Sequence, residues 1–433
     1  MSEAHTLTLV GGRPLRGRLR VPGDKGVSHR ALVFAALADG PSRIVGLADG
    51  DDVTRTRGAL EMLGVGIRPT DGGLTIAGAG PSGLREPETV LECGNSGTTM
   101  RILAGLLAGR PFHSVLAGDR SLAVRPMGRV VEPLRAMGAQ LDGRDGGGRS
   151  PLAIRGGGLR GIEHDLEVAS AQVKTALILA GLQAEGATVI REPHPSRDHT
   201  ERLLRSLGAP IERVDSTTVT VEAGEPAPFD LEVPGDPSSC AFFTVAASIV
   251  PGSEIVLEGV SVNPTRLGFV DVLCRMGAEI EVTETELRLG EPVGDIRVAA
   301  APLRGTVIEG REIPNVIDEL PVLAVAAAVA EGPSEIRDAS ELRVKESDRI
   351  AAVEQELAQL GVEIEVRPDG FTITGGARLA GAVMKSHGDH RIAMSVAVAA
   401  LVAEGESTIR GWQSVEVSYP AFMNDLERIL PSA

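Results

Sequence analysis

One order of apolar and polar positions recurs along the whole chain. In residues 204–211, LRSLGAPI, apolar positions three and four residues apart end at a Gly and give way to an alternating stretch. This pattern predicts the last turn of an amphipathic helix, a glycine cap and then a strand. Similar copies begin at residues 60, 134, 273 and 357, and a shortened copy spans 426–430.

Between these copies lies a second shared pattern. An alanine-rich apolar stretch, a Gly and a β-branched stretch follow one another in residues 34–45, 177–190, 243–256, 323–336 and 396–409. Because these helices are apolar on every side, we expect them to be buried beneath the amphipathic ones. The chain therefore predicts an α/β protein of six β-α-β-α-β-β units that arose by internal duplication.

The segment Val-Pro-Gly-Asp occurs twice, at residues 21–24 and 233–236, each time before an apolar helix. Two such hinges suggest two lobes of three units each. We expect residues 1–22 with 234–433 to form one lobe and residues 23–233 to form the other.

Composition narrows the class of protein. With 433 residues, 42% hydrophobic and 24% charged, the chain is typical of a soluble globular protein of two or three domains. No apolar run approaches the roughly 20 residues of a membrane helix, and the first ten residues lack a signal-peptide pattern. The three cysteines form no C-x-x-C pair, which argues against zinc or disulfides and indicates a reducing compartment, the cytoplasm.

Charge and motifs exclude several partners. A net charge of −16, with one Trp and one Tyr, argues against nucleic acid. Residues 78–83 match G-x-G-x-x-G, but Pro81 interrupts the helix that a dinucleotide site needs, and a G-x-x-x-x-G-K-[ST] loop is missing. A small anion can still bind where cations converge.

The stretch 22–30, PGDKGVSHR, offers such a cation. Lys25 stands between two glycines just ahead of a predicted helix over residues 31–38, with Ser28 as the expected N-cap and Arg30 in the first turn. The backbone N–H groups at a helix start favour an anion, and Gly lets a ligand approach closely. An ordinary capped helix explains this loop equally well.

Other charged and hydroxyl residues stand at the same place in different repeats. Gly97, Gln172, Lys345 and Arg391 all lie at or near predicted helix starts. If the repeats are oriented alike, these starts converge on an anion pocket. Alternatives stay open for each motif: residues 94–99 suit a capped helix, and 343–349, RVKESDR, suits a solvated charge run.

Two acidic residues are candidates for proton transfer at that pocket. Asp318 interrupts an apolar stretch, where an acid either caps a helix or works as a base. Glu346 lies beside Lys345 and Arg349, which would share one face of a helix at spacing i, i+4.

Together, these motifs resemble the EPSP synthase (3-phosphoshikimate 1-carboxyvinyltransferase) family over essentially the whole chain. PGDKGVSHRAL, GNSGTTMR, GDRSLAVRPM, SAQVKTAL, RDHT, IDELPVLAVAAA, RVKESDR and DHRIAM occur in the family's order. The resemblance implies a two-lobed inside-out α/β barrel in which each lobe has three repeats around buried parallel helices. Helix N-termini would face the cleft between the lobes.

The resemblance also implies a reaction. Phosphoenolpyruvate and shikimate 3-phosphate would give 5-enolpyruvylshikimate 3-phosphate and phosphate, with no metal or organic cofactor. The partners would be these two small molecules, without nucleic acid or membrane, and we expect a monomer.

Site residues are carried over from the matching motifs. The resemblance makes Asp318 the base for the 5-hydroxyl, Glu346 the acid and base at the enolpyruvyl carbon, and Lys25 a contact for both substrates. The residues implied for shikimate 3-phosphate are Lys25, Gly26, Arg30, Ser170, Ala171, Gln172, Ser196, Arg197, Asp318 and Lys345. Those implied for phosphoenolpyruvate are Lys25, Asn95, Gly97, Arg125, Gln172, Arg349 and Arg391.

Three departures from the family pattern stand out. Gly26 replaces the usual Ser or Thr, a stacking Tyr near Ser196 is missing, and the segment 417–420, VSYP, lacks the Lys that some members carry there. Glyphosate competes with phosphoenolpyruvate in this family, and Gly97 leaves room that a methyl group would fill, so a glyphosate-sensitive enzyme is expected.

Two alternatives remain. UDP-N-acetylglucosamine enolpyruvyl transferases share the fold, but usually carry a reactive Cys, sometimes Asp, in a mobile loop of the first lobe, and residues 118–127 contain no Cys. A non-catalytic anion-binding protein of the same fold is the alternative from another class.

Overall fold

The computed structural model describes residues 5–80 and 83–430, so Pro81 of the 78–83 motif lies outside the described residues. The chain divides into two compact units. Unit 1 takes in the described residues of Met1–Pro22, Pro234–Glu286 and Pro292–Ala433. Unit 2 consists of Gly23–Val233, without the two undescribed residues, and Leu287–Glu291.

The described residues of unit 2 form three sheets that share one strand order. They are β14-β3-β5-β4, β6-β7-β9-β8 and β10-β11-β13-β12, and in each the first pair is parallel and the other two pairs are antiparallel. The strands are β3 (Pro41–Val45), β4 (Gly66–Thr70), β5 (Gly73–Ala77), β6 (Leu91–Glu92), β7 (His113–Ala117), β8 (Gln140–Arg144), β9 (Arg149–Arg155), β10 (Glu163–Asp165), β11 (Thr188–Arg191), β12 (Ile211–Arg213), β13 (Thr218–Val221) and β14 (Asp230–Glu232).

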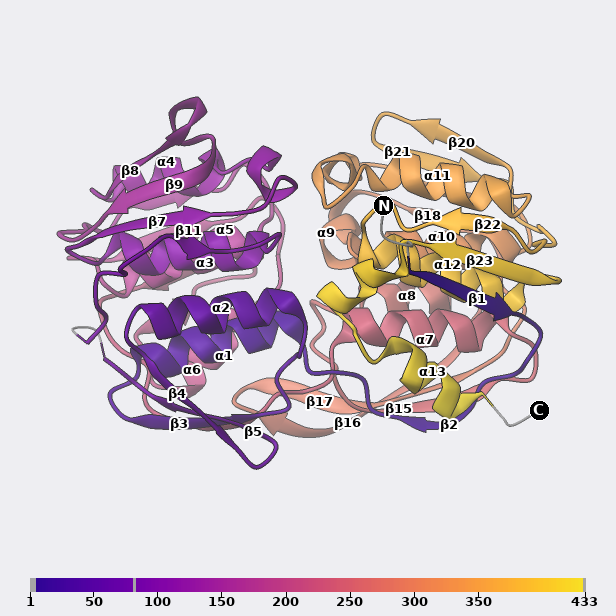
Figure 1. Cartoon of the computed structure of the whole chain (residues 1–433), viewed down its shortest axis with the longest axis horizontal. Helices are drawn as coiled ribbons and strands as arrows, with labels where there is room; N and C mark the ends of the chain where they lie inside the picture. Colours follow the sequence, from indigo (N-terminus) through magenta and orange to yellow (C-terminus); the bar gives the residue numbers. More distant parts are fainter. Residues whose placement is uncertain (1–4, 81–82, 431–433) are drawn as a thin grey trace. The chain divides into compact units, whose positions relative to one another are not determined.

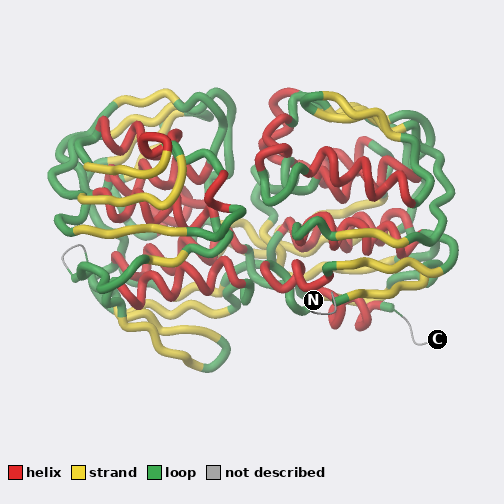
Figure 2. Tube along the Cα trace, turned by 45° about the horizontal axis from the view of Figure 1, so that its top comes forward, coloured by secondary structure: helices red, strands yellow, loops and turns green. Residues whose placement is uncertain are grey.

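The described part of unit 2 has an inner and an outer set of helices (Figure 1). The inner ones are α1 (Lys25–Leu37), α3 (Gly97–Ala108) and α5 (Ala171–Gly181), and α3 packs against both others. The outer ones are α2 (Asp51–Met62), α4 (Gly128–Ala136) and α6 (His199–Ser206). Figure 2 shows strands on the outside of these helices.

Unit 1 repeats the design with one difference. Its sheets are β2-β15-β17-β16, β18-β19-β21-β20 and the three-stranded β22-β23-β1. The strands are β1 (Thr6–Val10), β2 (Arg16–Leu19), β15 (Glu254–Ser261), β16 (Glu279–Arg288), β17 (Glu291–Ala299), β18 (Val307–Ile308), β19 (Ser334–Ile336), β20 (Ile364–Arg367), β21 (Gly370–Ile373), β22 (Val383–Lys385) and β23 (Glu406–Arg410). In the third sheet β1 pairs antiparallel with β23, so an early strand completes the shortened last repeat (Figure 1).

The helices of unit 1 follow the same division. The inner helices α7 (Pro237–Ile249), α10 (Leu320–Val329) and α12 (His390–Val402) pack on one another. The others are α8 (Gly268–Arg275), α9 (Ile313–Val316), α11 (Arg349–Gln359) and α13 (Phe422–Ile429). The inner helices are buried on nearly every side, as their unbroken apolar sequence predicts.

The predicted glycine caps are confirmed. Gly64, Gly138, Gly208, Gly277 and Gly361 follow the ends of α2, α4, α6, α8 and α11, and each has a positive φ that side chains other than Gly rarely adopt. The α/β repeat is therefore visible both in the sheet order and in the turn that separates each outer helix from its strand.

Candidate active site

The first candidate residue, Lys25, opens helix α1. Asp24 caps this helix by accepting a hydrogen bond from the backbone N–H of Val27 at 2.9 Å. The prediction that Ser28 is the cap was wrong: Ser28 lies inside the helix, and its hydroxyl accepts from the N–H of Ala48 at 3.0 Å. The helix starts earlier than expected because the Asp side chain supplies the first acceptor.

The Lys25 ammonium is held in place by a neighbouring helix. Its Nζ lies 2.8 Å from Oδ2 of Asp52 in the first turn of α2, and both side chains are largely buried. An ammonium carries three donors, so it can hold one carboxylate and bind a ligand anion as well.

Arg30 ties three helices together within unit 2. Its Nε donates to Thr200 at 2.7 Å, and its two terminal nitrogens donate to Thr175 and to the carbonyl of Gly26, each at 2.8 Å. Burial lowers the pKa of Arg30 to about 10, although Glu201 partly offsets this effect. The guanidinium therefore joins the starts of α1, α5 and α6.

The start of α3 carries a cation that the sequence analysis did not single out. Arg101 donates to Oε1 of Gln172 at 2.6 Å and to the carbonyl of Pro126 at 3.1 Å. The amide of Gln172 in turn donates to Thr98 at 2.8 Å. Position 101 lies within the GNSGTTMR motif, but nothing in the local pattern distinguishes it from a surface arginine, since its partners are distant in sequence.

Gly97 lies directly against these cations. A Cβ at this position would stand 2.7 Å from Nη1 of Arg101 and 3.3 Å from Nη1 of Arg125. The space that the sequence suggested beside Gly97 is therefore bordered by two guanidinium groups. Asn95, another candidate, precedes Ser96, which caps α3 by accepting from the N–H of Thr99 at 3.2 Å.

The remaining candidates of unit 2 stand at the starts of α5 and α6. Ser170 caps α5, so Ala171 and Gln172 form its first turn. Ser196 is buried, and its hydroxyl has no hydrogen-bond partner among the described residues. Arg197 follows it directly. Asp198 precedes α6 without a side-chain cap hydrogen bond, and its carboxylate pairs with Arg202 and Arg213.

In unit 1 the candidate base lies among three cations. Oδ1 of Asp318 is 3.4 Å from Nζ of Lys345 and 3.5 Å from Nη1 of Arg349. Its Oδ2 is 3.9 Å from Nη2 of Arg391, and its backbone carbonyl accepts from Nη1 of Arg391 at 3.1 Å. Asp318, Lys345 and Arg349 come from one repeat and Arg391 from the next, and they meet within one unit.

Arg349 is the centre of this cluster. Its side chain is 1% exposed and contacts Asp389 at 2.8 Å and Glu346 at 2.6 Å. Burial alone would weaken its charge, but Asp389 and Glu346 together hold the pKa of Arg349 above its ordinary value. Burial likewise opposes the charge of Asp389, but Arg349 lowers the pKa of this carboxyl below its ordinary value. The guanidinium and Asp389 are therefore charged at any ordinary pH.

One predicted relation in this cluster was wrong. Lys345 and Arg349 do not share a helix, because Lys345 ends the 3₁₀ turn Ser340–Val344 while α11 starts at Arg349, capped by Asp348. They still face one carboxylate, Asp318, across the turn.

Arg125 and Lys345 hold equivalent places in two units. Arg125 ends the 3₁₀ turn Leu122–Val124 ahead of α4, as Lys345 ends its turn ahead of α11. The repeat thus presents a cation just before an outer helix in both units. Internal duplication thus places cations at equivalent positions, although the local sequence does not show that they share a function.

The comparisons with known proteins are consistent with this geometry. The EPSP synthase (3-phosphoshikimate 1-carboxyvinyltransferase) family matches residues 9–426. The chain belongs to the EPSP synthase family. Membership makes it an enzyme of the enolpyruvyl transferase class acting in the shikimate pathway.

Individual relatives match over nearly their full length. A 3-phosphoshikimate 1-carboxyvinyltransferase of Synechococcus sp. (strain JA-3-3Ab) is 52% identical, covering 99% of this chain and 98% of the relative. That of Gloeobacter violaceus is 53% identical, with 99% of each chain covered. The EPSP synthase structure from Acinetobacter baumannii superposes with a TM-score of 0.87 at 42% identity, covering 98% of both chains.

A more distant structure shares the fold alone. The enolpyruvyl transferase NikO from Streptomyces tendae has a TM-score of 0.80 at 20% identity, covering 98% of both chains. Two lobes of α/β repeats are thus common to several enolpyruvyl transferases, and the fold by itself does not select the acceptor substrate.

The departures from the EPSP synthase pattern have structural counterparts. Gly26 offers its carbonyl to Arg30, and a Cβ there would approach Oδ1 of Asp24 to 3.1 Å. In the segment without the usual Lys, Tyr419 is fully buried, and its hydroxyl donates to Asp425 at 2.9 Å. This aromatic residue therefore serves the core of unit 1.

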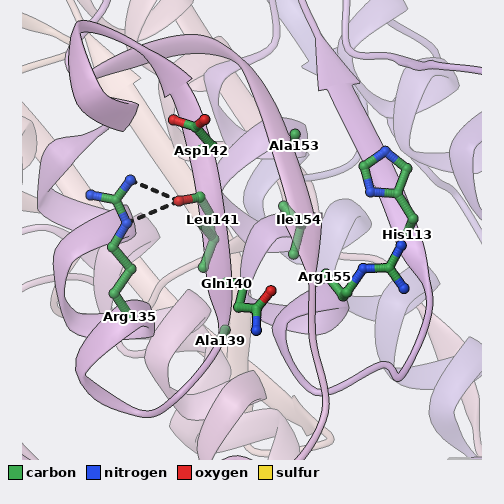
Figure 3. A pocket seen from close by; sticks show the side chains of 9 residues that line it. All are labelled: His113, Arg135, Ala139, Gln140, Leu141, Asp142, Ala153, Ile154 and Arg155. Atoms are coloured by element: carbon green, nitrogen blue, oxygen red, sulfur yellow. Dashed lines mark hydrogen bonds between the residues drawn. The ribbon is translucent and has the colours of Figure 1, made fainter.

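A pocket of about 270 Å³ lies apart from these EPSP synthase motifs, at the strands β7, β8 and β9 (Figure 3). His113, Arg155 and Arg135 line it, and Arg135 donates twice to the carbonyl of Leu141, at 3.0 and 2.7 Å. It brings together none of the candidate residues, so we do not assign the reaction to it.

Three further findings concern the described residues alone. No group of three or more His, Cys, Asp or Glu side chains there is arranged to hold a metal ion. Cys93, Cys240 and Cys274 are unpaired, and burial raises the pKa of Cys93 and of Cys240 to about 12. None of the described helices is both long and apolar enough to span a bilayer.

Proposed function

We propose that the clusters of both units serve one reaction, the transfer of the enolpyruvyl group from phosphoenolpyruvate to the 5-hydroxyl of shikimate 3-phosphate. The observation that carries this assignment is the carboxylate of Asp318 with Lys345, Arg349 and Arg391 within 3.9 Å. A base surrounded by cations suits a reaction between two anions, because the cations bind the substrates while the base accepts a proton.

Asp318 is the base in this proposal. It takes the proton of the 5-hydroxyl as that oxygen attacks C2 of phosphoenolpyruvate. Glu346 donates a proton to C3 in the same addition, which gives a tetrahedral adduct. When the C–O bond to phosphate breaks, a proton returns from C3 to Glu346 and the enol ether forms, while the proton held by Asp318 passes to the departing phosphate.

Glu346 is suited to this exchange by position. Arg349 holds its Oε2 at 2.6 Å, and the side chain keeps 21% of its surface exposed. In this proposal its contribution as an acid depends on proximity to C3.

Each substrate has its own set of proposed contacts among the candidate residues. Lys25 contacts both. Shikimate 3-phosphate takes Gly26, Arg30, Ser170, Ala171, Gln172, Ser196, Arg197, Asp318 and Lys345, while phosphoenolpyruvate takes Asn95, Gly97, Arg125, Gln172, Arg349 and Arg391. Arg101 joins the second group as the residue that orients Gln172 at 2.6 Å.

Release of phosphate in the presence of both substrates tests the proposal. We expect turnover with shikimate 3-phosphate and none with UDP-N-acetylglucosamine as the acceptor. Asp318→Asn should lower kcat by about two to four orders of magnitude while the protein keeps its thermal stability, as for loss of a general base. Turnover with the UDP-sugar instead would favour the alternative transferase, and an Asp318→Asn variant of full activity would contradict the role of the base.

The proposal also covers the cell compartment and the oligomeric state of the enzyme. Three unpaired cysteines suit a reducing compartment, so we place the enzyme in the cytoplasm. It acts as a monomer in this proposal, since a single chain contains all of the candidate residues. Light scattering of the purified protein with and without substrates checks the second point.

A further inference from the structure

The start of helix α10 differs from that of the other inner helices. Asp24, Ser96, Ser170, Asp236 and Asp389 each cap their own helix with a side-chain oxygen. Glu319 holds the corresponding place before α10 but caps nothing, and Pro321 removes one of the N–H groups that a cap would bind. Its carboxylate is therefore available for another purpose.

The carboxylate of Glu319 is buried and faces the start of another helix. Its side chain is 1% exposed, and its Oε1 accepts a hydrogen bond from the hydroxyl of Ser238 in α7. Its Oε2 has no hydrogen-bond partner among the described residues. Burying such a charge is costly unless a cation compensates it, so this carboxylate needs an explanation.

The direction of the bond from Ser238 is set by an arginine. Nη2 of Arg266 donates to the Ser238 hydroxyl at 2.8 Å and to Oδ1 of Asp236 at 3.0 Å. A guanidinium can only donate, so the hydroxyl must accept from Arg266 and direct its own proton elsewhere. That proton goes to Glu319. Arg266, which is 3% exposed, thus fixes Ser238, and Ser238 fixes Glu319.

On its other side Glu319 meets a proposed substrate ligand. Its Oε1 lies 3.9 Å from Nη1 of Arg391, and Oδ2 of Asp318 lies 3.9 Å from Nη2 of the same guanidinium. Two neighbouring carboxylates thus attract Arg391 at equal distances, one through each terminal nitrogen. The side chain of Arg391 is 8% exposed, so these attractions are only weakly screened by solvent.

We infer that Glu319 is a positioning residue that keeps Arg391 directed toward phosphoenolpyruvate instead of collapsing onto the base Asp318. The inference rests on the proposed function, because it takes Arg391 as a phosphoenolpyruvate ligand and Asp318 as the base. Without the charge on Glu319, the attraction of Asp318 is unopposed. Arg391 then moves toward that carboxylate, which both removes a cation from the substrate and neutralises the base.

Glu319→Gln is the direct test, since it keeps the side-chain volume and an oxygen for Ser238. We expect the KM for phosphoenolpyruvate to rise about tenfold, a loss of about 1.4 kcal/mol in binding. The KM for shikimate 3-phosphate should stay unchanged. Equal changes in both KM values, or a lower melting temperature with both KM values unchanged, would overturn the inference.

A second pair of variants covers the case in which Glu319→Gln does not fold. Ser238→Ala keeps Glu319 but removes the hydroxyl that fixes it, so the KM for phosphoenolpyruvate should rise selectively. Ser238→Thr keeps the hydroxyl and should restore the wild-type value. Ser239→Ala, one residue further along α7 and also buried, is the matched control and should leave both KM values unchanged. Ser238→Ala with wild-type kinetics would contradict the inference.

Arg391→Lys separates this inference from the proposed function. If that change leaves the KM for phosphoenolpyruvate unaltered, the assignment of Arg391 itself is wrong. If it raises that KM while neither Glu319→Gln nor Ser238→Ala does, only the role of Glu319 fails.

Discussion

The Nζ atom of Lys25 lies 2.8 Å from Oδ2 of Asp52, joining the first turn of α1 to that of α2. The side chain of Lys25 is 22% exposed and that of Asp52 is 9% exposed, so the pair lies at the edge of the protein interior. A lysine side chain is long and flexible, and the carboxylate restricts the directions in which its charge can point.

Removing either member of this pair should affect activity more than stability. Lys25→Met deletes the cation that both substrates share, and we expect kcat/KM to fall by at least about a hundredfold, or about 2.7 kcal/mol. Asp52→Asn keeps the cation but frees its direction, so a smaller loss of about tenfold is expected. Steady-state kinetics and a thermal melt measure both effects; a larger loss for Asp52→Asn than for Lys25→Met would contradict this account.

Gly97→Ala should weaken the binding of phosphoenolpyruvate and of glyphosate. The added methyl group would meet Arg101 at 2.7 Å and Arg125 at 3.3 Å, so the guanidinium of Arg101 must move away from Gln172. The wild-type enzyme should be glyphosate-sensitive, and the variant should show a higher inhibition constant together with a higher KM for phosphoenolpyruvate.

Gly58→Ala provides the matched control for that substitution. Gly58 lies in α2, and a methyl group there would meet no neighbouring element of the described chain within 4 Å, so Ala should leave inhibition unchanged. Equal glyphosate inhibition of wild type and Gly97→Ala would show that the methyl group does not reach the ligand.

Lys174→Met should cost stability. Nζ of Lys174 lies 2.7 Å from both Glu192 and Glu201, and all three side chains are buried. Losing the cation leaves two buried carboxylates without compensation, which costs about 3–5 kcal/mol in the free energy of unfolding. Lys385→Met, at an exposed lysine, is the control and should change little. Urea unfolding measures both, and equal midpoints would refute the prediction.

The cluster of Lys174, Glu192 and Glu201 also predicts that the free energy of unfolding falls at high pH. Burial opposes the charge of Lys174, but Glu201 and Glu192 raise its pKa above the ordinary lysine value. A raised pKa in the folded state means that the stabilisation is complete below the unfolded value of about 10.4 and disappears as the pH rises through the folded pKa. In Lys174→Met the unfolding free energy should therefore vary less above that pH than in the wild type.

His29 predicts a loss of stability on the acid side. Burial lowers its pKa to about 3, even though Asp52 acts in the opposite direction, and its Nδ1 lies 2.7 Å from the hydroxyl of Thr56. The unfolded chain takes up a proton at about pH 6.5 while the folded one does not, so stability falls from there toward pH 3 by up to about 1.4 kcal/mol per pH unit. His29→Gln should reduce this slope in urea unfolding between about pH 4.5 and 7, and an identical slope would contradict it.

The repeat and its glycine turns could be predicted because they depend on local order. The helices α2, α4, α6, α8 and α11 each end at a Gly of positive φ that the apolar pattern locates on its own. Ser28 was misjudged for a related reason: both it and Asp24 are good caps, and only the tertiary contact with Ala48 explains where the Ser hydroxyl goes.

Partners distant in sequence could not be predicted from pattern alone. Arg101 resembles any polar residue on a helix until Gln172, on another helix, meets it. Lys345 and Arg349 were expected to act together, and they do, but through Asp318 and not through a shared helix face. Resemblance to a family transferred Asp318, Lys345 and Arg349 without the reason for their positions, and it did not transfer Arg101.

The pairing of β1 with β23 has a consequence for how the polypeptide is made. Leu7 is opposite Ile409 in that ladder, so β1 cannot pair until the ribosome has released a strand about 400 residues further along. Unit 2 is nearly continuous and can collapse while synthesis is still under way. Contacts of such large sequence separation form slowly, so closing this ladder sets a late step in maturation.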